Sequence, residues 1–310
     1  MQNSLAIVIP AFKPDYLEKA LSSLACQTCL DFSVYIGDDA SPYDLKCITD
    51  KFSGILNLTY HRFSENMGAT NLVGQWERCV KLCKDEKWVC LFSDDDMMEC
   101  GCIDAFSHFP IDSHVDVLHF DIDIIDENDN IIQECPKFPS VLDSGSFFNL
   151  LFRHQLVSRI PEFIFRKERL IKEGFVFFDL AWRSDTATVI NLAYPHGIHT
   201  IPGKDTKVLW RASHANISGD PKLKERKNKV NIKFFNWVHS FFANHAITVP
   251  MSRFYLLKTI VFALEWEDWH SFIKEGWKVS KGLNFISPAE RVLFMLFVLY
   301  RLPYRLKEIR

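Results

Sequence analysis

The first hundred residues alternate between short apolar runs and longer segments with helical character, and this alternation restricts the fold more than any other feature. Four apolar runs have the length of buried strands: Leu5–Pro10, Phe32–Gly37, Leu56–Phe63 and Lys87–Phe92. Helices are predicted between them, over Tyr16–Ala25, Asp44–Phe52 and Ala69–Lys84. Strands that alternate with helices predict an α/β fold, with a mostly parallel sheet and helices on both faces.

The remainder of the chain predicts a second, mixed segment followed by helices. The alternation over Val115–Ile125 predicts a half-exposed strand, and a return strand begins at Ile131. A helix over Ser146–His154 and a strand over Glu162–Arg166 follow. Four helices are predicted near the end, over residues 222–244, 252–266, 269–281 and 288–307. We therefore expect an α/β domain over residues 1–218, with halves 1–105 and 106–218, and a helical extension over 219–310.

Two clusters of carboxylates follow predicted strands directly. Asp94, Asp95 and Asp96 come after one strand, and Asp38 and Asp39 come after another. Ligands of open parallel sheets bind beyond the carboxyl ends of the strands, so we expect both clusters at one edge. Crowded carboxylates raise each other's pKa unless a cation binds, and Mg²⁺ or Mn²⁺ prefers oxygen ligands. The alternative interpretation of the triplet is an acidic turn in solvent.

Charge is unevenly distributed along the chain. The net charge is −3, yet the residues from Gly219 onward contain 16 Lys and Arg against 8 Asp and Glu. A basic C-terminal third indicates either an anionic partner surface or ordinary solvated helices. The segment Arg291–Arg310 combines apolar residues with basic ones, and its length and charge suit a helix in a membrane interface. Packing of that helix on the rest of the protein, or on a second subunit, is the alternative.

The number of cysteines indicates the cellular compartment in which the protein works. The chain has nine cysteines, all before Pro136. An odd number argues against a complete set of disulfides and favours a reducing compartment. No basic leader precedes the first strand, and no apolar stretch of spanning length occurs. We expect a cytoplasmic protein, peripheral at most on the inner face of the membrane.

The order of the motifs then resembles a known family. Pro10-Ala11-Phe12 ends the first strand, Asp38-Asp39-Ala40-Ser41 ends the second, and Asn66-Met67-Gly68 precedes the acidic triplet. Gln27-Thr28, Phe32 and Val34 also stand at matching places. This set resembles the family-2 glycosyltransferases, nucleotide-sugar enzymes of the GT-A fold, over residues 4–105 and more loosely to about residue 220.

The resemblance implies a nucleotide site in the first half of the domain. Phe12 would lie against the nucleotide base, where stacking contributes ~1–3 kcal/mol, and Pro10 would be part of the same nucleotide site. Asp38 and Asp39 would accept a base N–H or a ribose hydroxyl. Asn66 and Gly68 would shape the loop around the nucleotide. Core packing, a turn cap and a helix N-cap are the corresponding structural alternatives.

The resemblance also assigns the metal site. Asp94 would bind the ribose or a metal-bound water, Asp96 would ligate Mn²⁺ or Mg²⁺, and Asp95 lies between them. Ser93 stands where the family often has the first Asp of its motif, which leaves open which two carboxylates hold the metal.

The second half of the domain would supply the base and further phosphate contacts. Asp185 matches the family's catalytic base, with Asp179 as the reserve candidate and a helix N-cap as the structural alternative. Arg211 and Asn216 match a segment that contacts phosphate or metal-bound water. Ser213 replaces the family's histidine ligand, and His214 stands one residue later.

The resemblance implies a metal-dependent glycosyltransferase that inverts the anomeric carbon. The expected partners are a nucleotide-sugar donor and a glycan or lipid-linked acceptor, as in surface polysaccharide synthesis; an oligomer is compatible, and no nucleic acid is expected. Two alternatives stand beside it: a binding module without catalysis and a nucleotidyltransferase. The loop after the first strand contains no glycine, which disfavours the latter. The sequence does not identify the donor sugar, base or acceptor.

Overall fold

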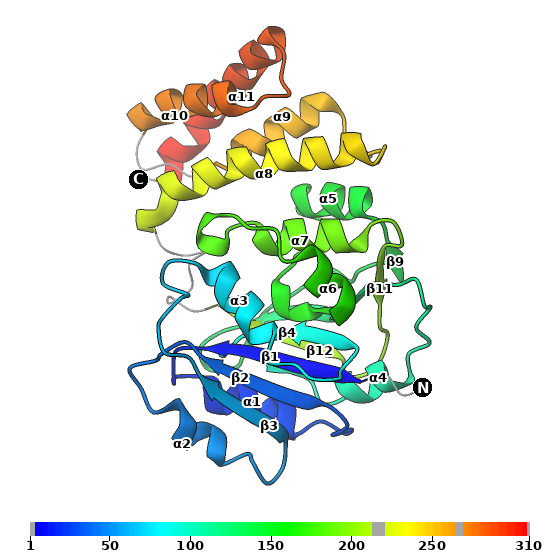
Figure 1. Cartoon of the computed structure of the whole chain (residues 1–310). Helices are drawn as coiled ribbons and strands as arrows, with labels where there is room; N and C mark the ends of the chain where they lie inside the picture. The colour runs from blue at the N-terminus through cyan, green and yellow to red at the C-terminus, as the bar shows by residue number, and fades with distance from the viewer. Residues whose placement is uncertain (1–3, 213–220, 265–268, 309–310) are drawn as a thin grey trace.

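A mixed eight-stranded sheet forms the centre of the protein (Figure 1). The computed structural model describes residues 4–212, 221–264 and 269–308. Across this sheet the strands follow in the order β3 (Asn57–Arg62), β2 (Ser33–Asp38), β1 (Leu5–Ala11), β4 (Trp88–Leu91), β10 (Phe163–Arg166), β6 (Val117–His119), β11 (Ile198–Thr200) and β9 (Val141–Leu142). β3, β2, β1 and β4 are parallel, whereas β10 pairs antiparallel with β4 and β6. The parallel sheet that was predicted for the first half of the domain is therefore found in these four strands.

A second, four-stranded sheet corrects one prediction. It contains β5 (Met97–Met98), β12 (Lys207–Arg211), β7 (Asp121–Ile125) and β8 (Ile131–Glu134). The segment predicted as one half-exposed strand is two strands, β6 and β7, which belong to different sheets. The prediction of a solvent face was wrong because His119 and Asp123 are buried. Asp123 is 1% exposed and binds Lys207 at 2.6 Å.

Eleven α-helices are found in the described residues. Their bounds are α1 (Leu17–Ala25), α2 (Leu45–Asp50), α3 (Leu72–Val80), α4 (Cys102–His108), α5 (Ser144–Phe152), α6 (Lys167–Glu173), α7 (Ser184–Ala193), α8 (Lys224–Asn244), α9 (Arg253–Phe262), α10 (Trp269–Gly282) and α11 (Pro288–Glu308). The four C-terminal helices lie where the sequence predicted them. Among residues 4–212, 221–264 and 269–308, we find no helix with the length and hydropathy of a bilayer-spanning segment.

Both faces of the large sheet are buried, and β1 shows why its sequence is apolar throughout. Its odd-numbered residues, such as Ile7 and Ile9, pack in a core with α1, α2 and α4. Its even-numbered residues Ala6 and Val8 pack in a second core with α3, α5 and α7. Successive side chains of a strand point to opposite faces, so a strand covered on both faces needs apolar residues at every position.

The C-terminal helices share the second core rather than forming a separate one. In Figure 1, α8 crosses above α5 and α7, and α9–α11 lie beyond it. Phe234 and Phe235 of α8 contact Phe152 of α5, with ring centroids 5.6 and 5.3 Å apart. The aromatic side chains of α8 thus cover the face of α5 and α7 that points away from the sheet.

Candidate active site

The carboxyl ends of three parallel strands meet at one edge of the large sheet. β1 pairs with β2 on one side and with β4 on the other, in both cases in parallel. The segments that leave these strands therefore start side by side. The backbone N–H of Asp39 donates to the carbonyl oxygen of Ala11 at 2.9 Å, which holds the first two together.

Asp94 connects the end of β4 to the end of β1. Its Oδ2 accepts hydrogen bonds from the backbone N–H groups of Phe12, at 2.9 Å, and Lys13, at 3.1 Å. A carboxylate that accepts two N–H bonds fixes the backbone of this loop. The backbone of Phe12, whose ring is predicted to stack on the nucleotide base, is thus hydrogen-bonded to the acidic triplet.

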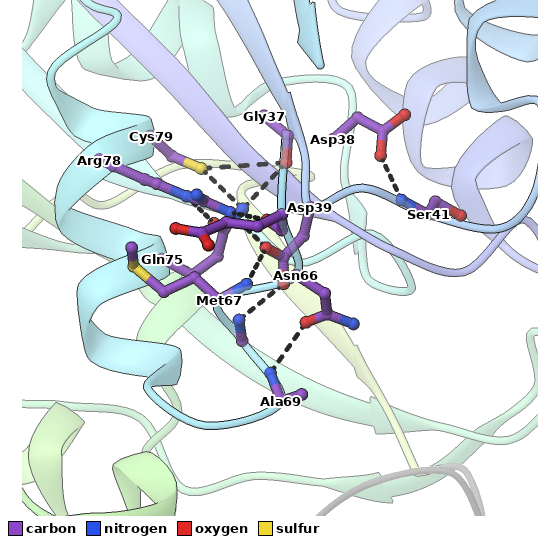
Figure 2. A network of polar contacts seen from close by, with 12 residues as sticks. Gly37, Asp38, Asp39, Ser41, Asn66, Met67, Ala69, Gln75, Arg78 and Cys79 are labelled. Carbon is purple, nitrogen blue, oxygen red and sulfur yellow. Dashed lines mark hydrogen bonds and ion pairs between the residues drawn. The ribbon is translucent and has the colours of Figure 1, made fainter. Parts of the chain in front are cut away.

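Asp39 organises the loop between β3 and α3, as Figure 2 shows. Its two oxygens accept the backbone N–H groups of Met67 and Gly68, both at 2.8 Å, and it forms an ion pair with Arg78. A Cβ on Gly68 would lie 2.5 Å from Asp39 Oδ2, so glycine is required by close approach. This loop occupies residues that were predicted as helix: α3 begins only at Leu72.

Asp38 points to the other side of its strand (Figure 2). Its Oδ1 accepts the backbone N–H of Ser41 at 2.8 Å, and its Oδ2 accepts from Arg62 at 2.7 Å and from the Tyr60 hydroxyl. Burial, and to a lesser extent the hydrogen bond to Asp38, raises the pKa of Tyr60 to about 12. Asp38 is fully buried and holds the turn that follows β2.

Asp96 lies beneath the surface of the site, against β12. Its Oδ1 accepts the backbone N–H of Arg211 at 2.8 Å, whereas its buried Oδ2 has no hydrogen-bond partner among the described residues. Arg211 donates from Nε to the carbonyl oxygen of Asp95 and forms an ion pair with Asp129 at 2.7 Å. Arg211 therefore holds Asp95 and Asp96 of the triplet in place through hydrogen bonds.

Burial raises the pKa of all three carboxyls of the triplet. For Asp94, burial outweighs the two backbone hydrogen bonds that lower its pKa. Burial, together with the adjacent Asp94 carboxylate, raises the pKa of Asp95 to about 6. Burial and the charge of Asp95 raise the pKa of Asp96 well above its ordinary value. Three such groups favour binding a proton or a cation.

A cavity of about 540 Å³ opens at this edge, and we call it the main cavity. Eight predicted site residues line it: Pro10, Phe12, Asp39, Asn66, Gly68, Asp94, Asp95 and Asp185. Asp38, Asp96, Asp179 and Arg211 are not part of its wall. Residues 213–220 lie outside the described residues, and with them Ser213, His214 and Asn216.

The two candidate bases have different surroundings. Asp185 lies in the first turn of α7 and faces the main cavity, and its Oδ1 accepts the backbone N–H of Thr186 at 2.7 Å. Asp179 forms a two-point contact with Arg226 of α8, at 2.7 and 3.0 Å. That guanidinium lowers the pKa of Asp179. The geometry thus favours Asp185, which follows the N-cap residue Arg183 and is not itself the cap.

The segment before Asp185 has an unusual backbone. Leu180, Ala181 and Arg183 have φ of 62°, 52° and 68°, in the left-handed region. Such conformations are costly for residues with a Cβ, and they concentrate at functional sites. Leu180, Ala181 and Arg183 all line the main cavity.

Sequence reasoning did not find several residues of the cavity wall. These are Lys13, Trp76, Arg159, Trp182, Arg183 and Trp210. Lys13 directly follows Phe12, and that adjacency was the available signal. Arg159 and Trp210 come from segments that tertiary packing brings together, with the Arg159 guanidinium 4.3 Å above the Trp210 ring. Trp210 directly precedes the predicted residue Arg211, whereas no local pattern marks Arg159.

The acidic triplet offers oxygen ligands for a metal ion but not a complete set. Among the described residues, no three His, Cys, Asp or Glu side chains form a ready-made metal site. Mg²⁺ is usually held by one or two carboxylates together with substrate phosphates, so a complete protein cage is not required. The unsatisfied Oδ2 of Asp96 and the cavity-facing carboxylates of Asp94 and Asp95 fit such a shared ion.

Comparisons with known proteins define the class. The chain belongs to glycosyltransferase family 2, because the family model described as "Glycosyl transferase family 2" matches residues 6–186. A search of curated protein sequences gives no match.

Solved structures agree on the fold. TarS 1–349 from S. aureus in complex with UDP-GlcNAc superimposes with a TM-score of 0.64 at 14% identity, covering 90% of this chain and 81% of that one. The mannosyltransferase PcManGT from Pyrobaculum calidifontis, in complex with GDP-Man and Mn²⁺, gives 0.52 at 13% identity, covering 98% and 88%. The expected GT-A fold and the assignment as a glycosyltransferase are thereby confirmed.

Proposed function

We propose that this glycosyltransferase binds a nucleotide-sugar in the main cavity and transfers the sugar, with inversion, to a glycan or lipid-linked hydroxyl. One observation carries the proposal. A single cavity contains the base-stacking candidate Phe12, the carboxylates of Asp39 and Asp94, and, from a different segment, Asp185. This arrangement supports donor binding on the sheet side and proton removal on the side of α7.

In this proposal, Asp39 acts mainly by shaping the loop around the nucleoside. Its hydrogen bonds to Met67 and Gly68 leave a glycine backbone facing the cavity. The ring of Phe12 supplies a flat apolar surface for the base. Asp94 holds the loop that carries this ring.

We propose that Mn²⁺ or Mg²⁺ is held by Asp96 together with Asp94 or Asp95, and by the diphosphate of the donor. When bound, the ion supplies Lewis acidity that stabilises charge on the leaving nucleoside diphosphate. Burial raises the pKa of Asp94 and Asp96, and a bound cation would favour the deprotonated form in which these carboxylates can ligate it.

Asp185 is proposed as the base that accepts the proton of the attacking hydroxyl. It faces the cavity at the start of α7, and the hydrogen bond from Thr186 orients its carboxylate. A positioned base contributes ~10²–10⁴-fold in rate. Asp179 forms an ion pair with Arg226, and it remains the weaker candidate for the base.

The decisive experiment is a panel of nucleotide-sugars tested with and without Mn²⁺, by thermal shift and by hydrolysis. A true donor at a hundredfold excess over its Kd stabilises by about 2.7 kcal/mol. We expect one donor to stabilise in the presence of metal and to be turned over, and Asp96→Ala to lose both effects. Donor binding without turnover, unaffected by Asp185→Asn, would indicate a binding module instead.

We further propose that α11 rests on an anionic membrane surface, which would bring the enzyme to a lipid-linked acceptor on the cytoplasmic face. One side of α11 exposes large apolar side chains: Val292, Leu296, Leu299 and Tyr300. Phe294, Phe297 and Val298, on its other side, are buried in the core. The basic excess from Gly219 onward complements anionic lipid.

A further inference from the structure

A second cavity, also of about 540 Å³, adjoins the main cavity, and we call it the side cavity. Three side chains, Arg159, Trp182 and Arg183, line both cavities. These three side chains form the boundary between the two cavities, so a molecule in the side cavity would contact residues that also face the main cavity. Asp185 follows Arg183 by two positions and faces the main cavity.

The wall of the side cavity carries cations. Arg159, Arg183, Lys224 and Arg301 line it, and the described residues of the wall include no Asp or Glu. These four come from four separate parts of the chain, so the cluster is a product of the fold. Cations concentrated in a cleft with low-dielectric walls attract an anion strongly.

The guanidinium groups are held in place. Arg301 donates to the carbonyl oxygens of Val261, at 2.6 Å, and Leu264, at 3.1 Å. Arg183 lies 5.1 Å from the Phe152 ring centroid and contacts Asn231 Oδ1 at 3.3 Å. Fixed, planar guanidinium groups match the geometry of phosphate oxygens and lose little entropy on binding.

We propose that the side cavity binds a phosphate group of the acceptor substrate. This inference rests on the proposed function, because only a transferase has an acceptor. The phosphate would be held by Lys224, Arg183 and Arg301, and the hydroxyl to be glycosylated would lie beyond Arg183 on the side of Asp185. Phe262 and Leu264, which line the same cavity, provide an apolar surface for another part of the acceptor.

Calorimetric titration of the full-length protein, in the presence of a chelator, tests the site. Glycerol 2-phosphate is the probe, and glycerol is its uncharged counterpart. We expect saturable binding of the phosphate ester only, with Kd raised about tenfold by Lys224→Gln, since hydrogen bonds to charged groups contribute ~1.5–3 kcal/mol. Lys229→Gln, on the exposed face of the same helix, is the matched control and should leave Kd unchanged.

Two further probes identify the kind of acceptor. Octyl phosphate that binds at least tenfold more tightly than glycerol 2-phosphate would indicate a lipid-linked phosphate. Equal affinities would indicate a soluble phosphate ester. Both outcomes support the site, whereas glucuronate that binds more tightly than either phosphate would overturn the assignment to phosphate.

The inference is also overturned if glycerol 2-phosphate does not bind. It fails equally if Lys13→Gln, in the main cavity alone, weakens binding while Lys224→Gln does not. Donor binding with Mn²⁺ is measured separately on the same variants. If the unsubstituted protein binds a donor but not glycerol 2-phosphate, only this inference is contradicted. If it binds no donor at all, the proposed function is contradicted.

Discussion

The carboxylate of Asp94 and the backbone of Phe12 are joined by a 2.9 Å hydrogen bond between the ends of two neighbouring strands. The same oxygen also accepts the N–H of Lys13. One oxygen of Asp94 is therefore committed to the protein backbone. A metal ion in this site would rely correspondingly more on Asp95 and Asp96.

Asp94→Ala should lower both stability and donor binding. The substitution leaves two N–H groups without their acceptor, which costs ~1–3 kcal/mol for each buried group left unsatisfied. Denaturant unfolding and donor-induced thermal shift measure the two effects. Asp104→Ala, on the exposed surface of α4, is the control and should change stability by at most ~0.5 kcal/mol. Equal stability of the two variants would contradict the role assigned to Asp94.

Gly68→Ala should raise the Kd for the nucleotide-sugar about tenfold, a change worth ~1.4 kcal/mol. The new Cβ would lie 2.5 Å from Asp39 Oδ2, so the loop must move away from the cavity. Gly54→Ala is the control, because nothing lies within 4 Å of its added Cβ. Donor titration of both variants measures the effect, and similar Kd values would show that this loop does not bind the donor.

Asp185→Asn should lower kcat by ~10²–10⁴-fold and leave the donor Kd within about twofold, as expected for loss of a general base. Asp179→Asn removes an exposed contact with Arg226 and should cost at most ~1 kcal/mol of stability, with little change in kcat. Single-turnover transfer assays separate the two. If Asp179→Asn is the inactive variant, the base has been assigned to the wrong residue.

Stabilisation by Mn²⁺ should increase as the pH rises from about 5 to 7.5. The pKa of Asp95 is raised to about 6 in the folded protein, above its unfolded value of ~3.9. Without metal, the contribution of this carboxyl is therefore fully present below about pH 4 and is lost as the pH rises through 6. A cation reverses this loss because it binds the deprotonated group.

The measurement is the shift in Tm caused by a fixed Mn²⁺ concentration at several pH values. Asp95→Asn should reduce the pH dependence of this shift, whereas Asp112→Asn, at an exposed carboxyl outside the main cavity, should not. A metal-induced shift that is constant between pH 5 and 7.5 would exclude titration of the triplet as its cause.

Val292→Asp combined with Leu296→Asp should weaken binding to anionic vesicles about tenfold or more, because two apolar side chains are replaced by charges. Both positions are exposed, so the fold should be retained. Ile131→Asp with Ile132→Asp, exposed on β8, is the matched control. Co-sedimentation measures binding, and equal loss in both double variants would locate no membrane contact on α11.

The parallel half of the sheet was predictable because each strand is buried on both faces. Runs such as Leu5–Ala11 contain no polar side chain, and periodicity identifies their helices directly. The segment around His119 was misjudged for the opposite reason. Its polar residues alternate as in an exposed strand, but tertiary partners such as Lys207 cover them, and sequence pattern alone contains no information about those partners.

The candidate site divides in the same way. Residues at strand ends, such as Phe12 and Asp39, were predictable from their positions. The opposite orientations of Asp38 and Asp39 follow from the strand period, but their partners Arg62 and Arg78 are tertiary contacts. Arg159 and Trp182 belong to loops whose position depends on the packing of α7 and α8, so no local pattern could have assigned them to the wall.

The packing of Phe234 and Phe235 against Phe152 has a practical meaning for engineering. The C-terminal helices cannot be exchanged between enzymes as a separate module, because their aromatic side chains complete the core that also contains α5 and α7. A chimera would have to include α5 and α7 together with the last four helices. A variant truncated before α8 would expose a large apolar surface to solvent.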